Sequence, residues 1–292
     1  MTQIGIGGAV IDRIEESVFT DFKATTFFAE WRPEVVAEHR NWMVPHHYNE
    51  ATGHLNLAIH SWLIRTGKHT VLVDTCVGND KRSKDHLAWH MKNWPYLERL
   101  AAAGVRPEQV DFVLCTHMHV DHIGWNTRLS NGRWVPTFPN ARYIFSKAEY
   151  DHCDAIYRKD AASRPSFEDS VLPVVAAGRA EMVSGAHMLG DHFLIEPAPG
   201  HTPGHVTIKL EDDEERAIFT GDILHHAIQV HHPQWNSQFC ADQVQARATR
   251  RRVLEYCEES GALMMPAHFG PSYACHIAAR GDSFAPRFLA GA

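Results

Sequence analysis

The stretch "CTHMHVDHIG" at residues 115–124 crowds three histidines and an aspartate into six consecutive positions. Residues two apart in an extended loop point the same way, so His117 and His119 can bind one ion. Asp121 and His122 follow where the chain turns towards a helix, and they can face a second ion. The chain contains 22 histidines, so chance crowding is the competing interpretation. Because single loop histidines are usually surface groups, the metal interpretation needs ligands from elsewhere in the chain.

Ligand-type residues also follow three later segments that we predict to be strands. His201 comes after one of them and completes a set of three imidazoles, and His268 comes after another and completes the second set. Asp222 is then the natural bridge, with one carboxylate oxygen for each ion. Imidazole and carboxylate ligands without thiolate are typical of catalytic zinc-type sites with open positions. The predicted ligands of two divalent ions, zinc first and Mn, Fe or Co as alternatives, are His117, His119, Asp121, His122, His201, Asp222 and His268.

Strand and helix patterns alternate along the chain, which predicts an α/β or α+β architecture with helices covering sheets. The predicted strands lie at 55–64, 69–75, 111–116, 141–146, within 192–210, at 216–222 and at 262–265, and the predicted helices at 94–103, 147–157 and 241–261. The first two strands form a hairpin with Gly67 in its turn. The ligand residues therefore lie at strand-to-loop junctions, where such architectures place their active sites. Residues 1–50 show no clean period and are expected to be irregular.

Composition narrows the class of protein. The chain has 292 residues, of which 44% are hydrophobic and 22% charged, as in globular domains. Its net charge is −7, and its one basic cluster, "RATRRR" at 247–252, is interpreted as a solvated helix face, so no nucleic-acid partner is expected. We find no secretory signal and no apolar run of roughly 18 residues, which predicts no membrane association. Six scattered cysteines without a CxxC pair indicate reduced thiols in a cytoplasmic protein.

The motifs, taken in order, resemble those of the metallo-β-lactamase superfamily over residues 54–270. The matching pieces are "VLVDT", "THMHVDHIG", "PGHTPGH", "FTGD" and "PAHFG". The resemblance implies an α+β fold, the αββα sandwich, with two mixed β-sheets flanked by helices and a dinuclear site along one edge. It also implies a single domain over 1–292, with 1–50 as an N-terminal extension that packs on the core or forms an interface. "GDILHHAIQVHHP" and "PGHTPGHVTI" are most similar to the branch that contains methyl parathion hydrolase, close to the acyl-homoserine lactonases.

This resemblance implies that a hydroxide bridging two ions cleaves an ester, lactone or phosphotriester bond of a small molecule. Asp121 would bind metal and pass a proton to the leaving group. His225 stands where the lactonases carry a tyrosine, three residues after the bridging aspartate, and is predicted to donate a hydrogen bond to the substrate. This replacement disfavours homoserine lactones without excluding other lactones or esters. Asp74 is expected to orient the ligand loops, and His205 to shape its own turn.

The four histidines that follow Asp222 have two interpretations, a pocket wall or a solvent-exposed loop; they are His225, His226, His231 and His232. The aromatic residues of 1–50 and the loop 76–94, with Trp89 and Trp94, are expected in ordinary packing or a homodimer interface. The alternative is an apolar pocket mouth for a hydrophobic acyl or aryl substrate.

The sequence is also compatible with three other functions. A persulfide dioxygenase with one iron shares the implied fold, but it does not need the second set of ligands. A glyoxalase-type thioesterase is a further alternative, although the 24 residues that follow His268 (269–292) are too few for the helical C-terminal domain of glyoxalase II. A binding or regulatory module with a vestigial site is disfavoured by the complete ligand set.

Overall fold

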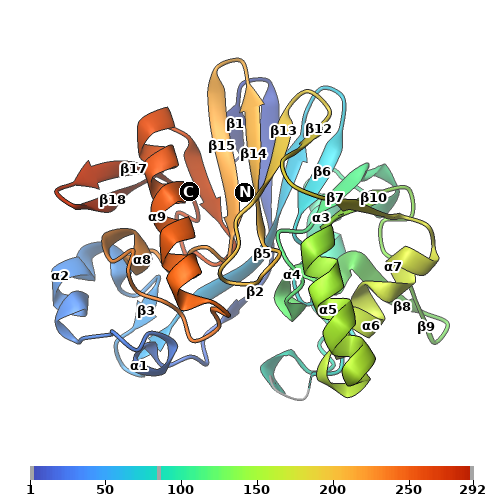
Figure 1. Cartoon of the computed structure of the whole chain (residues 1–292), viewed down its shortest axis with the longest axis horizontal. Helices are drawn as coiled ribbons and strands as arrows, with labels where there is room; N and C mark the ends of the chain where they lie inside the picture. Colours follow the sequence, from blue (N-terminus) through green and yellow to red (C-terminus); the bar gives the residue numbers. More distant parts are fainter. Residues whose placement is uncertain (1–2, 84–86, 290–292) are drawn as a thin grey trace.

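The computed structural model describes residues 3–83 and 87–289, and it places two β-sheets face to face with helices on both outer sides (Figure 1). The N-terminal sheet contains, in spatial order, β1 (Ile4–Ile6), β2 (Ala9–Phe19), β5 (Leu57–Arg65), β6 (Thr70–Val73), β7 (Phe112–Leu114), β10 (Arg142–Ser146) and β11 (Ala180–Val183). The C-terminal sheet contains β12 (His187–Leu189), β13 (Phe193–Pro197), β14 (Val206–Asp212), β15 (Glu215–Gly221), β16 (Leu263–Pro266), β17 (Cys275–Arg280) and β18 (Ser283–Phe288). The predicted αββα arrangement is confirmed.

The remaining elements connect or cover these sheets. Two small hairpins pair β3 (Tyr48–Asn49) with β4 (His54–Leu55) and β8 (Thr127–Ser130) with β9 (Arg133–Pro136). The α-helices are α1 (Ala24–Phe27), α2 (Glu34–Met43), α3 (Tyr96–Ala102), α4 (Val120–Ile123), α5 (Lys147–Lys159), α6 (Pro165–Ser170), α7 (Leu172–Ala176), α8 (Ile228–His231) and α9 (Gln243–Ser260). The 3₁₀ turns are η1 (Leu87–Trp89), η2 (Pro107–Gln109), η3 (Gly124–Asn126) and η4 (Ala161–Ser163).

Alternating apolar side chains hold the layers together, because each sheet is buried on both faces. On β16, Leu263 and Met265 belong to the cluster between the sheets, whereas Met264 belongs to the cluster beneath α9. β6 alternates in the same way, with Val71 between the sheets and Leu72 beneath the helices that cover the N-terminal sheet. The outer layers are thus α3 and α5–α7 on one side and α9 on the other (Figure 1).

Both sheets are mixed, and their parallel strands bring the ligand loops to one edge. β6, β7, β10 and β11 pair in parallel within the N-terminal sheet, and β15 pairs in parallel with β16 in the C-terminal sheet. The loop after β7 carries His117, the loop after β15 carries Asp222, and the loop after β16 carries His268. Since the carboxyl ends of parallel strands lie at the same edge, these side chains converge as the sequence predicts.

The two ends of the chain are more regular than the sequence indicates. The expectation of an irregular segment over 1–50 is wrong, because β1 and β2 add two antiparallel strands to the N-terminal sheet. The residues that follow, in α1 and α2, are buried against the rest of the chain through Phe27, Phe28 and Met43. The strand at 262–265 is also not the last one, since the hairpin β17–β18 extends the C-terminal sheet.

Two features of the described chain bear on its environment. None of the helices in residues 3–83 and 87–289 has the length and apolar character required to cross a membrane. All six cysteines are buried and free of disulfides.

One arginine of "RATRRR" is not solvated as expected, because Arg250 of α9 is fully buried. Its Nε donates to Ile223 O at 2.8 Å, and Nη1 donates to Pro233 O at 2.7 Å and to Trp235 O at 2.6 Å. A buried guanidinium requires such oxygens, because its charge cannot be removed at ordinary pH. Arg250 therefore ties α9 to the segment 223–236, which follows the predicted bridging aspartate.

We predict that Arg250→Met lowers the free energy of unfolding by about 3 kcal/mol, because several buried carbonyl groups lose their donor at once. Arg251→Met, on the exposed side of the same helix and paired with Glu255, is the control and is expected to cost less than about 1 kcal/mol. Urea unfolding followed by circular dichroism measures both values. Equal losses in the two variants would contradict the assigned role of Arg250.

Candidate metal centre

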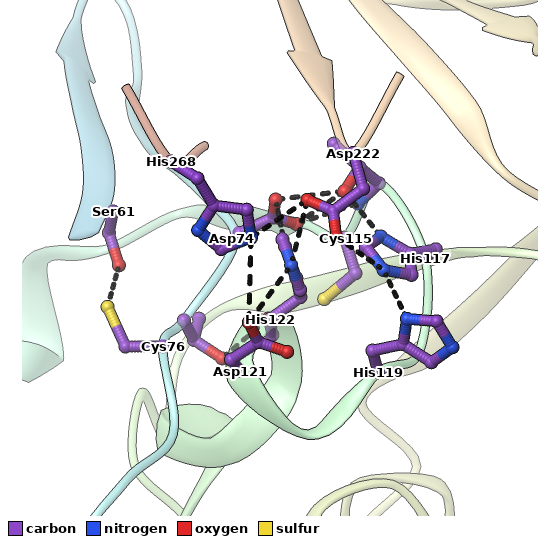
Figure 2. A network of polar contacts seen from close by, with 12 residues as sticks. Ser61, Asp74, Cys76, Cys115, His117, His119, Asp121, His122, Asp222 and His268 are labelled. Atoms are coloured by element: carbon purple, nitrogen blue, oxygen red, sulfur yellow. Dashed lines mark hydrogen bonds and ion pairs between the residues drawn. The ribbon is translucent and has the colours of Figure 1, made fainter. Parts of the chain in front are cut away.

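The first group of predicted ligands lies around the Nδ1 atom of His119, as Figure 2 shows in part. This atom lies 3.1 Å from His117 Nε2 and 2.8 Å from His201 Nε2. Asp222 Oδ2 lies 3.3 Å from His201 Nε2 and 3.7 Å from His117 Nε2. Three loops, after β7, β13 and β15, thus deliver four ligand atoms to one small volume.

The second group of predicted ligands lies around Oδ1, the other carboxylate oxygen of Asp222. Asp222 Oδ1 lies 3.0 Å from His268 Nε2 and 3.2 Å from His122 Nε2. Asp121 Oδ2 lies 3.5 Å from His268 Nε2 and 3.7 Å from His122 Nε2. The structure therefore brings all seven predicted ligand residues together, in two groups that share Asp222.

The donor set fits a pair of divalent cations. Ligand atoms about 2.0–2.1 Å from a tetrahedral zinc ion lie roughly 3.3 Å from one another, and the distances above, from 2.8 to 3.7 Å, scatter around this value. A ring nitrogen can form only one hydrogen bond in its plane, so His119 Nδ1 cannot bind both neighbouring imidazoles. His122 Nε2 is buried without a hydrogen bond to any described residue. A cation in each group would satisfy these atoms together.

Burial keeps the imidazoles of the first group in the form that binds metal. It lowers the pKa of His119 to about 4, and it lowers the pKa values of His117 and His201 well below the ordinary value. In the second group burial again lowers the pKa of His268, but the charge and hydrogen bond of Asp222 together with the charge of Asp121 raise this pKa above its ordinary value. Asp222 therefore attracts positive charge to the boundary between the groups, which a proton or a metal ion can supply.

Buried groups behind the ligands fix their orientation. Asp74, after β6, accepts hydrogen bonds from Thr116 N at 2.8 Å and from His122 Nδ1 at 2.9 Å (Figure 2). His268 Nδ1 donates to Ala58 O at 2.8 Å. In both histidines the Nδ1 proton is thus engaged, which leaves Nε2 to face the metal position. Asp74 has the orienting contacts that its place after β6 indicates.

His205 lies behind the first group rather than in the pocket. Its Nε2 atom accepts a hydrogen bond from Asp222 N at 3.1 Å, and its side chain is fully buried. It therefore holds the backbone of the bridging aspartate, in line with the expected structural role in the "PGHTPGH" turn.

Glu149 is a positioning residue that the sequence does not reveal. Its carboxylate accepts from Met118 N at 3.1 Å and from Gly204 N at 3.0 Å, so it joins the loop of His117 and His119 to the loop that follows His201. At Gly204 a Cβ would lie 2.0 Å from the Glu149 backbone nitrogen. The pattern "SKAE" at 146–149 has the sequence spacing of a capping box at the start of α5, and this local interpretation conceals the long-range role of Glu149.

Glu16 is a second buried acid that the sequence analysis missed. Its two oxygens accept from Val77 N at 3.0 Å and Gly78 N at 2.9 Å, and one also accepts from Trp125 Nε1 at 2.7 Å. Burial raises the pKa of this carboxyl to about 7, against the effect of these donors. It lies at a register shift in the pairing of β2 with β5. Glu16 thereby anchors the loop that follows β6 to the turn that follows α4.

A cavity of about 410 Å³ opens onto the metal residues. Its lining includes five of the predicted metal ligands and one neighbouring histidine, namely His119, Asp121, His201, Asp222, His268 and His225. Apolar side chains line much of the remainder, namely Phe19, Phe22, Phe27, Leu57, Ile59, Val77, Trp89 and Phe239. Phe19, Phe22 and Phe27 of the opening segment and Trp89 of the loop 76–94 therefore lie at the pocket. Phe28, Trp31, Trp42 and Trp94 pack in or against the core instead, as in the interpretation of ordinary packing. Residues 84–86 of this loop lie outside the described part of the chain.

The four histidines after the bridging aspartate occupy different positions in the fold. His225 is buried and lines the cavity, with Nε2 at 3.2 Å from Asp222 Oδ2. His226 is buried but turned away, since its Nε2 donates to His47 O at 3.0 Å. His231 stacks on His39 with ring centroids 4.2 Å apart, and His232 stacks on Trp235 at 4.4 Å. A pocket position is thus observed for His225 alone among these four, and the solvent-exposed interpretation is wrong for His225 and His226.

With this geometry established, comparison with known proteins identifies the family. Residues 54–268 match the metallo-β-lactamase superfamily. The chain belongs to this superfamily. The match covers more than half of the chain and includes all seven predicted ligands, so the resemblance inferred from the motifs is confirmed.

Within the superfamily, the chain is similar to proteins named as lactonases. An N-acyl homoserine lactonase of Bacillus cereus is 26% identical over 179 residues, which is 56% of this chain and 62% of the relative. The N-acyl homoserine lactonase AttM of Azorhizobium caulinodans is 25% identical over 195 residues, 60% of this chain and 66% of the relative. These alignments therefore span less than two thirds of the length of both relatives.

Solved structures of superfamily members share the fold along nearly the whole chain. The hydrolase AbOPH superposes with a TM-score of 0.81 at 22% identity, covering 98% of this chain and 96% of that one. AidC, a dizinc quorum-quenching lactonase in complex with a product, superposes with a TM-score of 0.80 at 19% identity, covering 100% and 98%. At these identities the likeness concerns the fold.

We predict that Glu149→Ala weakens metal binding about 10- to 100-fold, as the loss of groups that orient metal ligands commonly does. Competition with a chromogenic zinc chelator measures the affinity. Asp151→Asn, on the exposed side of the same helix and paired with Lys147, is the control and is expected to leave the affinity unchanged. Unchanged affinity in Glu149→Ala, with native circular dichroism, would disprove the positioning role.

Proposed function

We propose that this chain is a dinuclear zinc hydrolase that cleaves an ester, lactone or phosphotriester bond of a small molecule. The observation that carries the proposal is the placement of Asp222, whose two oxygens face two separate groups of buried ligand atoms. Imidazole and carboxylate ligands without thiolate suit zinc in catalysis, with Mn, Fe or Co as alternatives. The names of the similar lactonases agree with this class of reaction.

Two bound divalent ions would supply a water nucleophile of lowered pKa and would polarise the oxygen of the bond under attack. The side chains of the chain then bind and orient the substrate. Asp121 lines the cavity and is placed to return a proton to the leaving group, the role we assign to it. His225 lies beside Asp222 at the cavity wall, and we assign to it a hydrogen bond to the substrate.

The apolar wall of the cavity indicates what surrounds the scissile bond. Its volume of about 410 Å³ is in the range of small-molecule sites, and much of its lining beyond the metal ligands is aromatic or aliphatic. We therefore assign an acyl or aryl group to the part of the substrate that contacts Phe22, Phe27 and Phe239. The six buried free cysteines support a reducing compartment such as the cytoplasm.

The second ligand group distinguishes this proposal from a one-iron dioxygenase. Such an enzyme does not need Asp121, His122 and His268, yet here these residues converge on the free oxygen of Asp222. A thioesterase would use the same centre, so thioesters belong in any substrate panel.

We predict that the zinc-reconstituted chain holds about two ions and hydrolyses at least one class of lactone, aryl ester, phosphotriester or thioester. His119→Ala and His268→Ala are each expected to hold about one ion and to lose most of the activity, because each removes a ligand of a different group. Elemental analysis paired with the substrate panel gives both quantities.

His276→Ala, which changes an exposed histidine of β17, is the matched control and is expected to retain both ions. Two ions and full activity in His119→Ala would overturn the metal assignment. One iron and no zinc in the isolated chain would favour the dioxygenase.

We predict that His225→Ala lowers kcat/KM on the best substrate about 10- to 100-fold, because a hydrogen bond to the reacting group is lost. Metal content is measured alongside, since His225 also contacts Asp222. His231→Ala, in the same segment but away from the cavity, is the control with unchanged kinetics. Unchanged kcat/KM in His225→Ala would remove the substrate role, and loss of metal would reassign the residue to holding Asp222.

A further inference from the structure

Among the described residues, the cavity lining beyond the metal ligands carries more basic than acidic side chains, although the chain carries a net charge of −7. Apart from the metal ligands, its charged lining residues in the described chain are Lys81, Arg82, Arg164 and Asp169. Lys81 Nζ lies 3.1 Å from Asp169 Oδ1 and also donates to the hydroxyls of two neighbouring residues. This buried pair neutralises itself, so the two arginines leave a local excess of positive charge.

Arg164 is held in place by its backbone and by the helix it precedes. Its amide donates to Ala161 O at 3.2 Å, and its carbonyl accepts from Phe167 N at 3.1 Å. Phe167 is buried, and its ring lies 5.4 Å from that of Tyr150 on α5. α6 also contacts α4, which carries the metal ligands Asp121 and His122. The start of α6 is therefore fixed relative to the proposed metal centre.

Arg164 is half-buried and lines the cavity wall. Within the described residues, no carboxylate lies at ion-pair distance from it and no side-chain hydrogen bond engages it. Arg82 is more exposed, and water screens its charge more strongly.

The aromatic part of the cavity wall comes from a different part of the fold. Phe27 belongs to α1, and Phe19 ends β2, whereas Arg164 precedes α6. Figure 1 shows α1 and α6 at opposite sides of the lower end of the molecule. A molecule in the cavity can thus contact both the aromatic residues and Arg164, which come from different elements.

We propose that the cavity selects substrates that carry a carboxylate in addition to the bond to be hydrolysed, and that Arg164 binds this carboxylate. This inference rests on the proposed hydrolase function and names its substrate class. Arginine is suited to the task, since its planar fork donates two parallel hydrogen bonds to one carboxylate. The carboxylate would also place the opposite, apolar end of the substrate against the phenylalanines.

Matched esters test this selectivity in the zinc-loaded protein. The charged substrates are the 4-nitrophenyl monoesters of succinic, glutaric and adipic acids, and the neutral ones are 4-nitrophenyl esters of unbranched acids of equal chain length. We expect wild type to prefer a charged ester, and Arg164→Gln to reduce the ratio of charged to neutral kcat/KM about 10- to 100-fold, chiefly through KM. Arg164→Lys should restore part of the ratio, and added salt should lower it in wild type.

Arg158→Gln is the matched control, because Arg158 is an exposed arginine of α5 paired with Asp154. It should retain the wild-type ratio. The absence of a preference in wild type, or an unchanged ratio in Arg164→Gln, would overturn the proposal. A ratio that falls only in Arg82→Gln would overturn the assignment to Arg164.

A binding measurement separates this inference from the hydrolase function. Calorimetric titration compares 4-phenylbutyrate with neutral 4-phenylbutanamide on wild type and Arg164→Gln. Tighter binding of the carboxylate that is lost in Arg164→Gln supports the anion site even if no ester is hydrolysed. A carboxylate preference that persists in Arg164→Gln, or none in wild type, contradicts it, whatever the catalytic activity.

Discussion

The whole arrangement depends on one shared carboxylate, that of Asp222. Because its two oxygens face different groups of ligand atoms, the two groups must lie within the width of a single carboxyl group. Six other side chains from several loops have to converge at this spot, and their nitrogen and oxygen atoms repel one another unless positive charge lies between them. The fold must therefore hold these loops in register with one another.

Buried carboxylates behind the metal ligands hold the ligand loops together. Asp74 joins β6 to the loop of His122, Glu149 joins two ligand loops, and Glu16 joins the loop after β6 to the turn after α4. Each carboxylate accepts hydrogen bonds from donors in segments distant in sequence. The free-energy cost of burying its charge is therefore offset only when the loops are correctly placed. The buried cation Arg250 acts in a comparable way, because it donates hydrogen bonds to the carbonyl groups of Ile223 and Pro233 in the segment that follows Asp222. The metal ligands and the folded core are thus stabilised together.

The sequence could predict features that depend on residues close together in the chain. It could not predict features that depend on contacts between residues far apart in the chain. The ligand set was predictable because the spacing of "HMHVDH" and the strand ends before Asp222 and His268 are local signals. Glu149 and Arg250 were not, since their partners lie far away in sequence and their local patterns have ordinary helical explanations. β2 was missed because it is buried along much of both faces, and its charged residues hide the alternation. Long-range pairing determines which polar residues are buried.

The match to the superfamily begins at residue 54, whereas part of the aromatic wall comes from earlier residues. Phe19, Phe22 and Phe27 lie outside the matched range, and Arg164 lies inside it but outside every ligand motif. The residues that would hold the metals and those that would select the substrate therefore come from different parts of the sequence. Because the first set is constrained by the geometry around Asp222, the second set has more freedom to vary with the substrate. Motifs alone could indicate the reaction, but the cavity wall is required to infer which molecule enters it.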